Sequence, residues 1–191
     1  MNRAFLIILL GLIYTNTHAQ KINIDRIDED GKRQIMTTSK SIFIKGMEYD
    51  ACMKVYEKDN EQDWHLLISS YNHIPNSAEI LLKLGNEEII YLPANNVNIG
   101  KVSTPGYAIT SGKYTTFLPS KNINYYSSIY ELSQTNMDKI DTFGITKIRI
   151  SNGDEYIDRT FTYNYLGKFL SKCREIIAKR LETPQNIFDG F

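Results

Sequence analysis

The chain has 191 residues, of which 42% are hydrophobic and 12% are aromatic, so it is long enough to bury the core of one globular domain. Its 22 basic and 22 acidic residues give a formal net charge of zero. A neutral chain with interspersed charges argues against nucleic acid and against anionic membrane as partners, and we expect neither.

The first 19 residues have the three parts of a secretory signal peptide. A short basic start at Arg3 precedes an apolar run over residues 4–14, and the sequence Thr-His-Ala at residues 17–19 resembles a cleavage site. The apolar run is too short to span a bilayer, and no later run is long or apolar enough to do so. We therefore expect cleavage near Ala19 and a periplasmic or secreted product without a transmembrane segment; an uncleaved anchor is the alternative.

Strands joined by short turns are predicted along the first half of the mature chain. Residues 22–27 alternate between apolar and polar side chains, and Asp30-Gly31 predicts a two-residue turn that places Asp28 opposite Arg33. Such short connections favour antiparallel pairing. Further strands are predicted at 33–38, 51–56 and 64–69, with an apolar patch at 42–44 and a polar turn at 58–62.

Another hairpin is predicted around Gly85-Asn86, which has the composition of a type II′ turn. This turn places Lys83 opposite Glu88 and Leu82 opposite Ile89. Apolar pairs then fall on both faces of the hairpin. We therefore expect it to be central in the sheet and covered on both sides.

Residues 93–111 are rich in Asn, Ser, Pro and Gly and predict a long loop. Compact domains seldom contain a connection of this length without a use for it. One interpretation is a loop that covers a ligand or binds a partner, and the other is simply a long connection. After it come predicted strands at 113–117 and 124–130, and a short helix from a capping box of Thr135 and Asp138 to Gly144.

The last part of the chain predicts a hairpin followed by a long helix. Asn152-Gly153 predicts a type I′ turn that pairs Ile148 with Ile157 and Lys147 with Asp158. Beyond it, apolar residues recur at intervals of three and four, which is typical of a helix with one apolar stripe. The stripe consists of Leu166, Phe169, Leu170, Cys173, Ile176, Ile177 and Leu181.

Together these elements predict the α+β class. We expect mainly antiparallel β structure in a curled sheet or partial barrel, with one long C-terminal helix packed on it. Residues 20–182 are predicted to form a single domain, and residues 183–191 a tail.

The chain lacks the sequence motifs of common catalytic and cofactor sites, including the nucleophile elbow, the zinc-protease motif and the phosphate loop. His65 and His73 lie eight residues apart, a spacing that matches no metal site. We therefore predict no catalytic residue, no metal site and no cofactor. A metal site of these histidines with the nearby Asp59, Glu61 and Asp63 is the alternative.

Tyrosines carry the main indication of ligand binding. Beside Asn, Ser and Thr, a tyrosine offers flat apolar area with a polar tip, which carbohydrate and protein partners can use. The alternative is that these tyrosines only half-cover a sheet face. The candidate ligand-binding residues, which lie in or after the long loop, are Tyr107, Tyr114, Tyr125, Tyr126 and Tyr130.

Cys52 and Cys173 are the only cysteines. In an oxidising compartment a disulfide between them would join a strand to the last helix. We favour two separate buried thiols, because a chain of this length needs no covalent cross-link to be stable.

Three segments near the C-terminus resemble small exported α+β domains of Bacteroidetes-type bacteria. They are Gly144-Ile-Thr-Lys-Ile-Arg-Ile150, Leu166-Gly-Lys-Phe-Leu170 and Lys179-Arg-Leu181, in a chain rich in Ile, Asn, Lys and Tyr. The resemblance covers the C-terminal third, implies an envelope location and carries over no active-site residue. In outline, the strands and the terminal helix also resemble pleckstrin-homology-like folds.

These observations favour a non-enzymatic exported module that binds, or assembles with, an envelope protein or glycan. One alternative is an envelope hydrolase acting on glycan or peptide, because the chain has many unassigned acidic residues. A second alternative is a structural subunit of an envelope complex.

Overall fold

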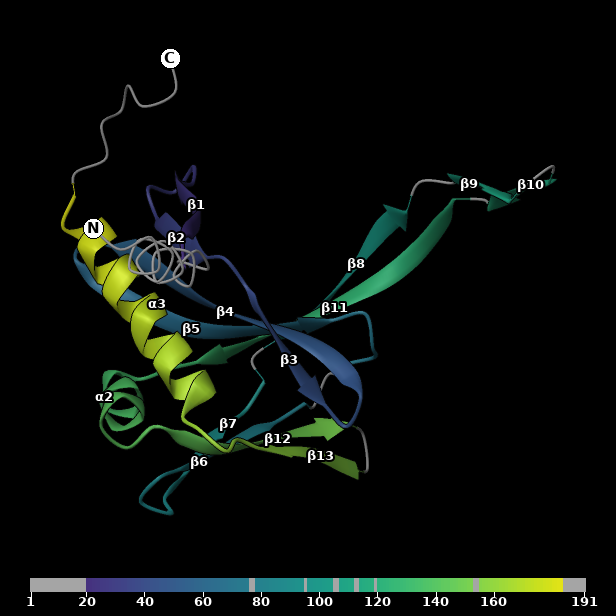
Figure 1. The fold of residues 1–191 in the computed structure, drawn as a ribbon. Helices are drawn as coiled ribbons and strands as arrows, with labels where there is room; N and C mark the ends of the chain where they lie inside the picture. The colour runs from purple at the N-terminus through teal and green to yellow at the C-terminus, as the bar shows by residue number, and fades with distance from the viewer. Residues whose placement is uncertain are drawn as a thin grey trace, which may run out of the picture.

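The computed structural model describes residues 20–75, 78–94, 96–104, 107–111, 114–118, 120–152 and 155–183. The predicted signal peptide at 1–19 and the predicted tail beyond residue 183 lie outside these ranges. The described residues form thirteen strands and two helices, and every strand pair is antiparallel. A curled sheet with a long C-terminal helix confirms the predicted α+β class (Figure 1).

The larger sheet has seven strands in the order β1-β2-β4-β5-β11-β8, with β3 pairing separately with β4. Its middle strands are long and bend around the core (Figure 1). The strands are β1 (Ile22–Ile27), β2 (Arg33–Thr37), β3 (Lys40–Ile44), β4 (Met47–Lys58), β5 (Glu61–Ser70), β8 (Asn96–Thr104) and β11 (Lys121–Glu131).

A smaller sheet of four strands, in the order β13-β12-β6-β7, closes the other side of the core. Its strands are β6 (Ile80–Leu84), β7 (Ile89–Leu92), β12 (Ile145–Asn152) and β13 (Glu155–Thr160). The helices are α2 (Gln134–Phe143) and α3 (Tyr165–Leu181), and β9 (Tyr107–Ser111) pairs with β10 (Tyr114–Leu118). Among the described residues no helix is long and apolar enough to cross a membrane.

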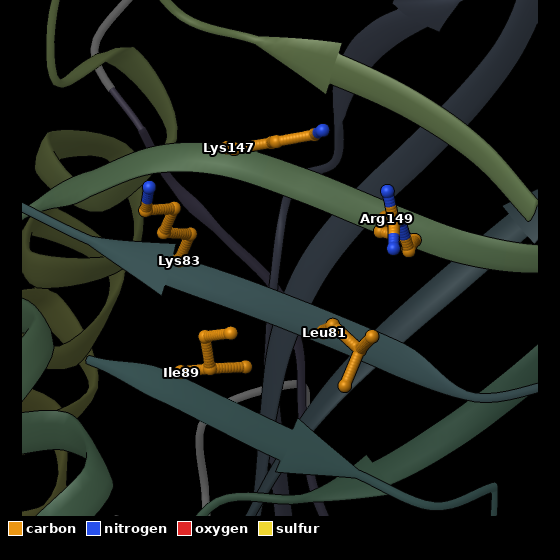
Figure 2. Close-up of a pocket in the computed structure, with 5 residues that line it drawn as sticks. All are labelled: Leu81, Lys83, Ile89, Lys147 and Arg149. Atoms are coloured by element: carbon orange, nitrogen blue, oxygen red, sulfur yellow. The ribbon is translucent and has the colours of Figure 1, made fainter. Parts of the chain in front are cut away.

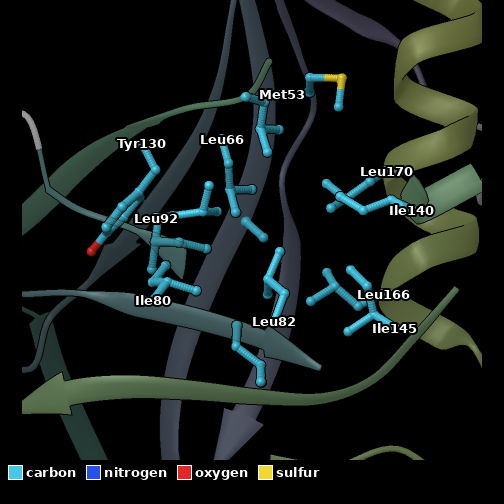
Figure 3. Packing of buried hydrophobic residues seen from close by; sticks show 14 of the residues in the cluster. Met53, Leu66, Ile80, Leu82, Leu92, Tyr130, Ile140, Ile145, Leu166 and Leu170 are labelled. Atoms are coloured by element: carbon cyan, nitrogen blue, oxygen red, sulfur yellow. The ribbon is translucent and has the colours of Figure 1, made fainter. Parts of the chain in front are cut away.

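The core lies between the two sheets and the helices (Figure 3). Leu66 of the larger sheet, Leu82 of the smaller sheet and Leu170 of α3 are each at most 1% exposed. Burial of a side chain of this size contributes roughly 1.5–3 kcal/mol. The predicted helical stripe is confirmed, because five of its seven members are buried and the other two, Ile176 and Leu181, are partly buried.

The first hairpin differs from its prediction by one residue. Arg33 pairs with Ile27 and not with Asp28, because the loop has three residues and not two. The carboxylate of Asp28 accepts hydrogen bonds from the backbone N–H groups of Asp30 and Lys32, and Gly31 takes a φ of 75°. These hydrogen bonds to the Asp28 side chain favour the three-residue loop, whose last residue, Gly31, has a left-handed backbone conformation.

The β6–β7 hairpin shows the same one-residue shift. Lys83 pairs with Ile89 and not with Glu88, because Glu87 adopts a positive φ of 71° and the loop has three residues. A shift of one residue moves side chains to the opposite face. Ile89 and Tyr91 are therefore 58% and 52% exposed, so the expectation of a central hairpin covered on both sides is wrong.

The β12–β13 hairpin is shifted by two residues, which keeps each side chain on its predicted face. Ile157 pairs with Ile150 and not with Ile148, and Asp158 pairs with Arg149 and not with Lys147. Both Ile148 and Ile157 are still buried. The predicted turn residue Gly153 lies outside the described residues.

The predicted loop at 93–111 is wrong, because most of it is extended strand. Residues of β8 pair with β11 along an unbroken ladder, and β9 pairs with β10. Together these strands form an arm that reaches away from the body of the molecule (Figure 1). The ladder supplies partners for the backbone, which here outweighs the loop-like content of Asn and Gly.

The short helix is confirmed, but its cap differs from the prediction. The side chain of Ser133, and not that of Thr135, accepts the backbone N–H of Asn136. The helix ends as predicted at Gly144, whose φ is 68° and whose N–H donates to the carbonyl of Ile140.

Asn164 fills a small space between Gly144 and Gly167, where α2, β12 and α3 meet. Its Oδ1 accepts the backbone N–H of Ile145 at 2.9 Å. A Cβ atom added at Gly144 or Gly167 would lie 2.2 Å or 2.0 Å from the nearest atom of this side chain. A residue with a Cβ at either position would therefore displace the Asn164 side chain from its present place.

A nearly buried ion cluster joins the two ends of the described chain. Arg33 donates two hydrogen bonds to the carboxylate of Asp25, at 2.9 and 3.0 Å, and Arg180 of α3 binds the same carboxylate. The side chains of Asp25 and Arg33 are only 8% and 10% exposed. Burial raises the pKa of Asp25, but hydrogen bonds from Arg33 and Arg180 outweigh this effect and hold the pKa below its ordinary value.

We predict that Gly167→Ala lowers the free energy of unfolding by about 1–3 kcal/mol, because the added methyl group overlaps Asn164. The overlap therefore costs more than the helix propensity gains, since alanine is favoured over glycine in a helix by about 1 kcal/mol. Urea denaturation measures the change. When Asn164 is replaced by alanine, Gly167→Ala should cost less stability than it does in the wild type. If the free-energy changes of the two substitutions simply add in the double variant, the proposed overlap is contradicted.

We predict that Asp25→Ala lowers the free energy of unfolding by about 3–5 kcal/mol at pH 7, because Arg33 loses its nearest carboxylate and the remaining one, that of Glu57, lies 3.9 Å away. The exposed Asp30→Ala is the matched control and should change stability by less than about 0.5 kcal/mol.

The same variant has an expected pH dependence. The folded pKa of Asp25 lies below the unfolded value of about 3.9, so its contribution is complete above roughly pH 5 and is lost as the pH falls through the folded pKa. Denaturation curves should therefore converge in acid. A constant difference between wild type and Asp25→Ala down to the lowest measurable pH would contradict the assignment.

Candidate functional site

The outer face of the smaller sheet carries the most distinctive group of exposed side chains. Along β6 and β12, side chains alternate between the core and this outer face. Five outward side chains from three strands surround a shallow hollow of about 130 Å³ (Figure 2). They are Leu81, Lys83, Ile89, Lys147 and Arg149.

Two lysines lie directly opposite each other on this face. Lys83 of β6 pairs in register with Lys147 of β12. Like charges at directly opposed positions destabilise a sheet. Each lysine has a carboxylate neighbour, since Lys83 binds Glu87 and Lys147 binds Asp158 at 2.5 Å.

Asp158 is shared between two cations. Arg149 donates two hydrogen bonds to this carboxylate, at 2.7 and 2.8 Å, and Lys147 binds it as well. The hydrogen bond from Arg149 is the largest cause of a strongly lowered pKa at Asp158. One carboxylate thus faces two cations, so positive charge is in excess around the hollow. The floor of the hollow is apolar and consists of Leu81 and Ile89.

Two tyrosines extend this face beyond the hollow. The hydroxyl groups of Tyr91 and Tyr156 donate to the two carboxylate oxygens of Glu79, at 2.6 and 3.4 Å. Their rings are about half exposed, and the guanidinium of Arg149 lies 5.6 Å from the ring centre of Tyr156. The hydrogen bond to Glu79 raises the pKa of Tyr91. Both rings are therefore held in place while remaining accessible.

The size of the hollow limits what it can hold. Small-molecule sites typically occupy about 300–1,000 Å³, more than twice the volume found here. A hollow of this size can accept a side chain of a partner, and the surrounding flat face can contact the partner's surface. Tyr, Arg and apolar residues are the types enriched at such contacts.

The candidate tyrosines from the sequence do not come together in one site. Tyr125 and Tyr126 are neighbours on β11 and point to opposite faces of the larger sheet. The hydroxyl of Tyr125 donates to Ser69 at 2.5 Å, whereas the ring of Tyr126 contacts His73. Tyr107 lies on β9 and Tyr114 on β10, and their side chains lie outside the described part of the structure.

Tyr130 is part of the core and cannot contact a ligand. Its side chain is 0% exposed and lies beside Leu66 and Leu92 (Figure 3). Burial raises its pKa to about 12. Its place among apolar side chains indicates a packing role.

Cys52 and Cys173 are buried free thiols in the structure. Burial raises the pKa of Cys52 to about 12 and that of Cys173 to about 11. Cys173 also accepts a hydrogen bond from the hydroxyl of Thr37 at 3.5 Å. Reactive thiolates need exposed, electropositive surroundings, which these positions lack.

The histidines are separated and have aromatic neighbours. The ring of His65 lies 5.6 Å from that of Tyr56, and burial lowers its pKa. Within the described ranges, no group of three or more His, Cys, Asp or Glu side chains could hold a metal ion. Three hollows lined by described residues contain a single carboxylate among them, that of Asp141.

Comparison of the chain with models of protein families, with curated proteins and with solved structures finds no match. The resemblance to exported domains of Bacteroidetes-type bacteria therefore stays a prediction.

We predict that Glu79→Gln lowers the pKa of Tyr91 towards the ordinary value of about 10, because the carboxylate is its main perturbing partner. NMR titration of ¹³C-labelled tyrosine rings measures this shift. The exposed Glu131→Gln on β11 is the matched control and should leave the titration unchanged. An unaltered Tyr91 titration in Glu79→Gln would show that the carboxylate does not hold this ring.

Proposed function

We propose that this protein is a non-enzymatic, exported module that binds a protein partner on the outer face of its smaller sheet. The opposed pair Lys83 and Lys147 is the observation that carries the proposal. Each lysine already binds one carboxylate, but with Arg149 the cations around the hollow outnumber these two carboxylates. An anionic group placed between the lysines would therefore be attracted to this face.

A protein partner fits this face better than a small ligand does. The hollow has room for a side chain, and the half-exposed rings of Tyr91 and Tyr156 extend its apolar surface beyond Ile89. Rigid tyrosines lose little conformational entropy on binding, and their hydroxyl groups are already held by Glu79. We therefore expect the partner to present an Asp or Glu side chain next to apolar residues.

The other functional hypotheses draw less support from the described residues. A hydrolase of the glycosidase type needs two carboxylates beside its substrate, and the three hollows above do not supply such a pair. A glycan is a second possible kind of ligand for half-exposed tyrosines, and the experiment below separates it from a protein.

The test is photo-cross-linking in the native host. A photoreactive amino acid in place of Ile89 should give a discrete adduct of higher mass that glycosidase does not shorten. The matched position is Tyr163, which is 82% exposed and lies between β13 and α3. Equal adducts from both positions, no adduct from position 89, or an adduct that glycosidase digests would overturn the proposal.

Charge reversal tests the role of the lysines. Lys83→Glu together with Lys147→Glu should reduce the yield of the adduct at least about tenfold, because like charges would then face the partner's carboxylate. The control is Lys58→Glu together with Lys168→Glu, two exposed lysines on other elements. Thermal unfolding of both variants confirms that they are folded. Equal yields from both double variants would contradict the charge argument.

A further inference from the structure

The arm of the larger sheet ends in an open edge strand. β8 is the last strand in the order of the larger sheet and pairs only with β11 among the described strands. Residues 98–103 are all exposed, including Ile99 at 61% and Val102 at 39%. An edge strand presents unpaired backbone N–H and C=O groups that another strand can bind.

β8 lacks the features that protect other edges of this molecule. β1 has an irregular register between Ile22 and Ile24, and β7 has only four residues. β13 carries the charged residues Glu155, Asp158 and Arg159. By contrast, β8 has nine residues, a single charged residue and a regular ladder with β11. Long edges with few charges are the ones prone to pair with another chain.

We infer that β8 pairs antiparallel with β8 of a second copy of this chain, around a two-fold axis at Gly100. Closed two-fold dimers are the commonest assemblies of identical chains. The zero net charge of the chain gives little long-range repulsion between copies. This inference is independent of the proposed function, because β8 belongs to the other sheet.

The sequence of β8 suits this pairing. With Gly100 opposite Gly100 of the second copy, Ile99 lies opposite Lys101 of that copy. The two lysines, the single charged residue of each strand, are therefore not opposite each other. The apolar stem of a lysine can cover a neighbouring isoleucine. Val102 lies opposite Asn98 of the second copy. The axis itself meets no side chain, because glycine occupies it.

The dimer would join the two larger sheets edge to edge. Nine residues in extended conformation give an edge of about 30 Å for backbone pairing. The outer face of the smaller sheet stays available in each copy, so two partner-binding faces would be carried by one assembly.

Sedimentation of the full chain over a concentration series tests the inference. The wild type should reach the mass of a dimer, and a chain that stays monomeric at the highest soluble concentration would overturn the inference. Open-ended assemblies without a dimer plateau would also overturn it.

A charge swap at one exposed position tests the register. Ile99→Lys places like charges opposite each other twice and should raise the dissociation constant at least about tenfold. Ile99→Glu places opposite charges there and should leave the constant unchanged or lower it. If both substitutions weaken the dimer equally, contact through the apolar side chain and not this register would hold the copies together. Ile27→Lys on β1, where the isoleucine is 54% exposed, is the control and should have no effect.

Disulfide trapping gives a second readout that does not depend on affinity. A Cβ at Gly100 meets only the carbonyl oxygen of Tyr125 at 3.8 Å, so Gly100→Cys fits the strand. Under mild oxidation this variant should form a covalent dimer, because the substituted position faces itself across the axis. Ser103→Cys is the matched control and lies opposite Val97 of the second copy. Equally fast trapping of both variants would overturn the proposed axis.

Discussion

The contact of Asn164 with two glycines determines how the helices join the sheets. Its amide side chain occupies the space beside Gly144 and Gly167 and binds the first residue of β12. This fixes the start of α3 against the end of α2. From there α3 can lay its apolar stripe over β4 of the larger sheet while still contacting β12 of the smaller sheet. The single core between the two sheets depends on this corner.

The parts of the fold that could be predicted from the sequence are those with long periodic patterns. The stripe from Leu166 to Leu181 repeats often enough to define both the helix and its buried face. Hairpins were located correctly but in the wrong register: one extra loop residue shifts the first hairpin and the β6–β7 hairpin by one position, and the β12–β13 hairpin is shifted by two. Nothing in the sequence indicates that Glu87 takes a positive φ, and the capture of two N–H groups by Asp28 becomes visible only in the folded loop.

The candidate site was missed for the same reason. With Ile89 assigned to the wrong partner, the outer face of the smaller sheet appeared to be covered, and the opposed lysines Lys83 and Lys147 come from strands more than sixty positions apart. Tyrosines close together in the sequence were a poor guide, because alternation along β11 sends Tyr125 and Tyr126 to opposite faces. A composition-based prediction of residues 93–111 likewise could not foresee that β11 would pair with β8.

The cluster of Asp25, Arg33 and Arg180 has a consequence for the order in which the chain matures. Asp25 and Arg180 are separated by 155 positions, and α3 is the last helix to be synthesised. Until it arrives, β2 and β4 lack the helix that packs on them, and Arg33 lacks part of its surroundings. Contacts of such high sequence separation form late and slowly. The core would therefore stay open until α3 has been synthesised, and its apolar side chains would be exposed to aggregation up to that point.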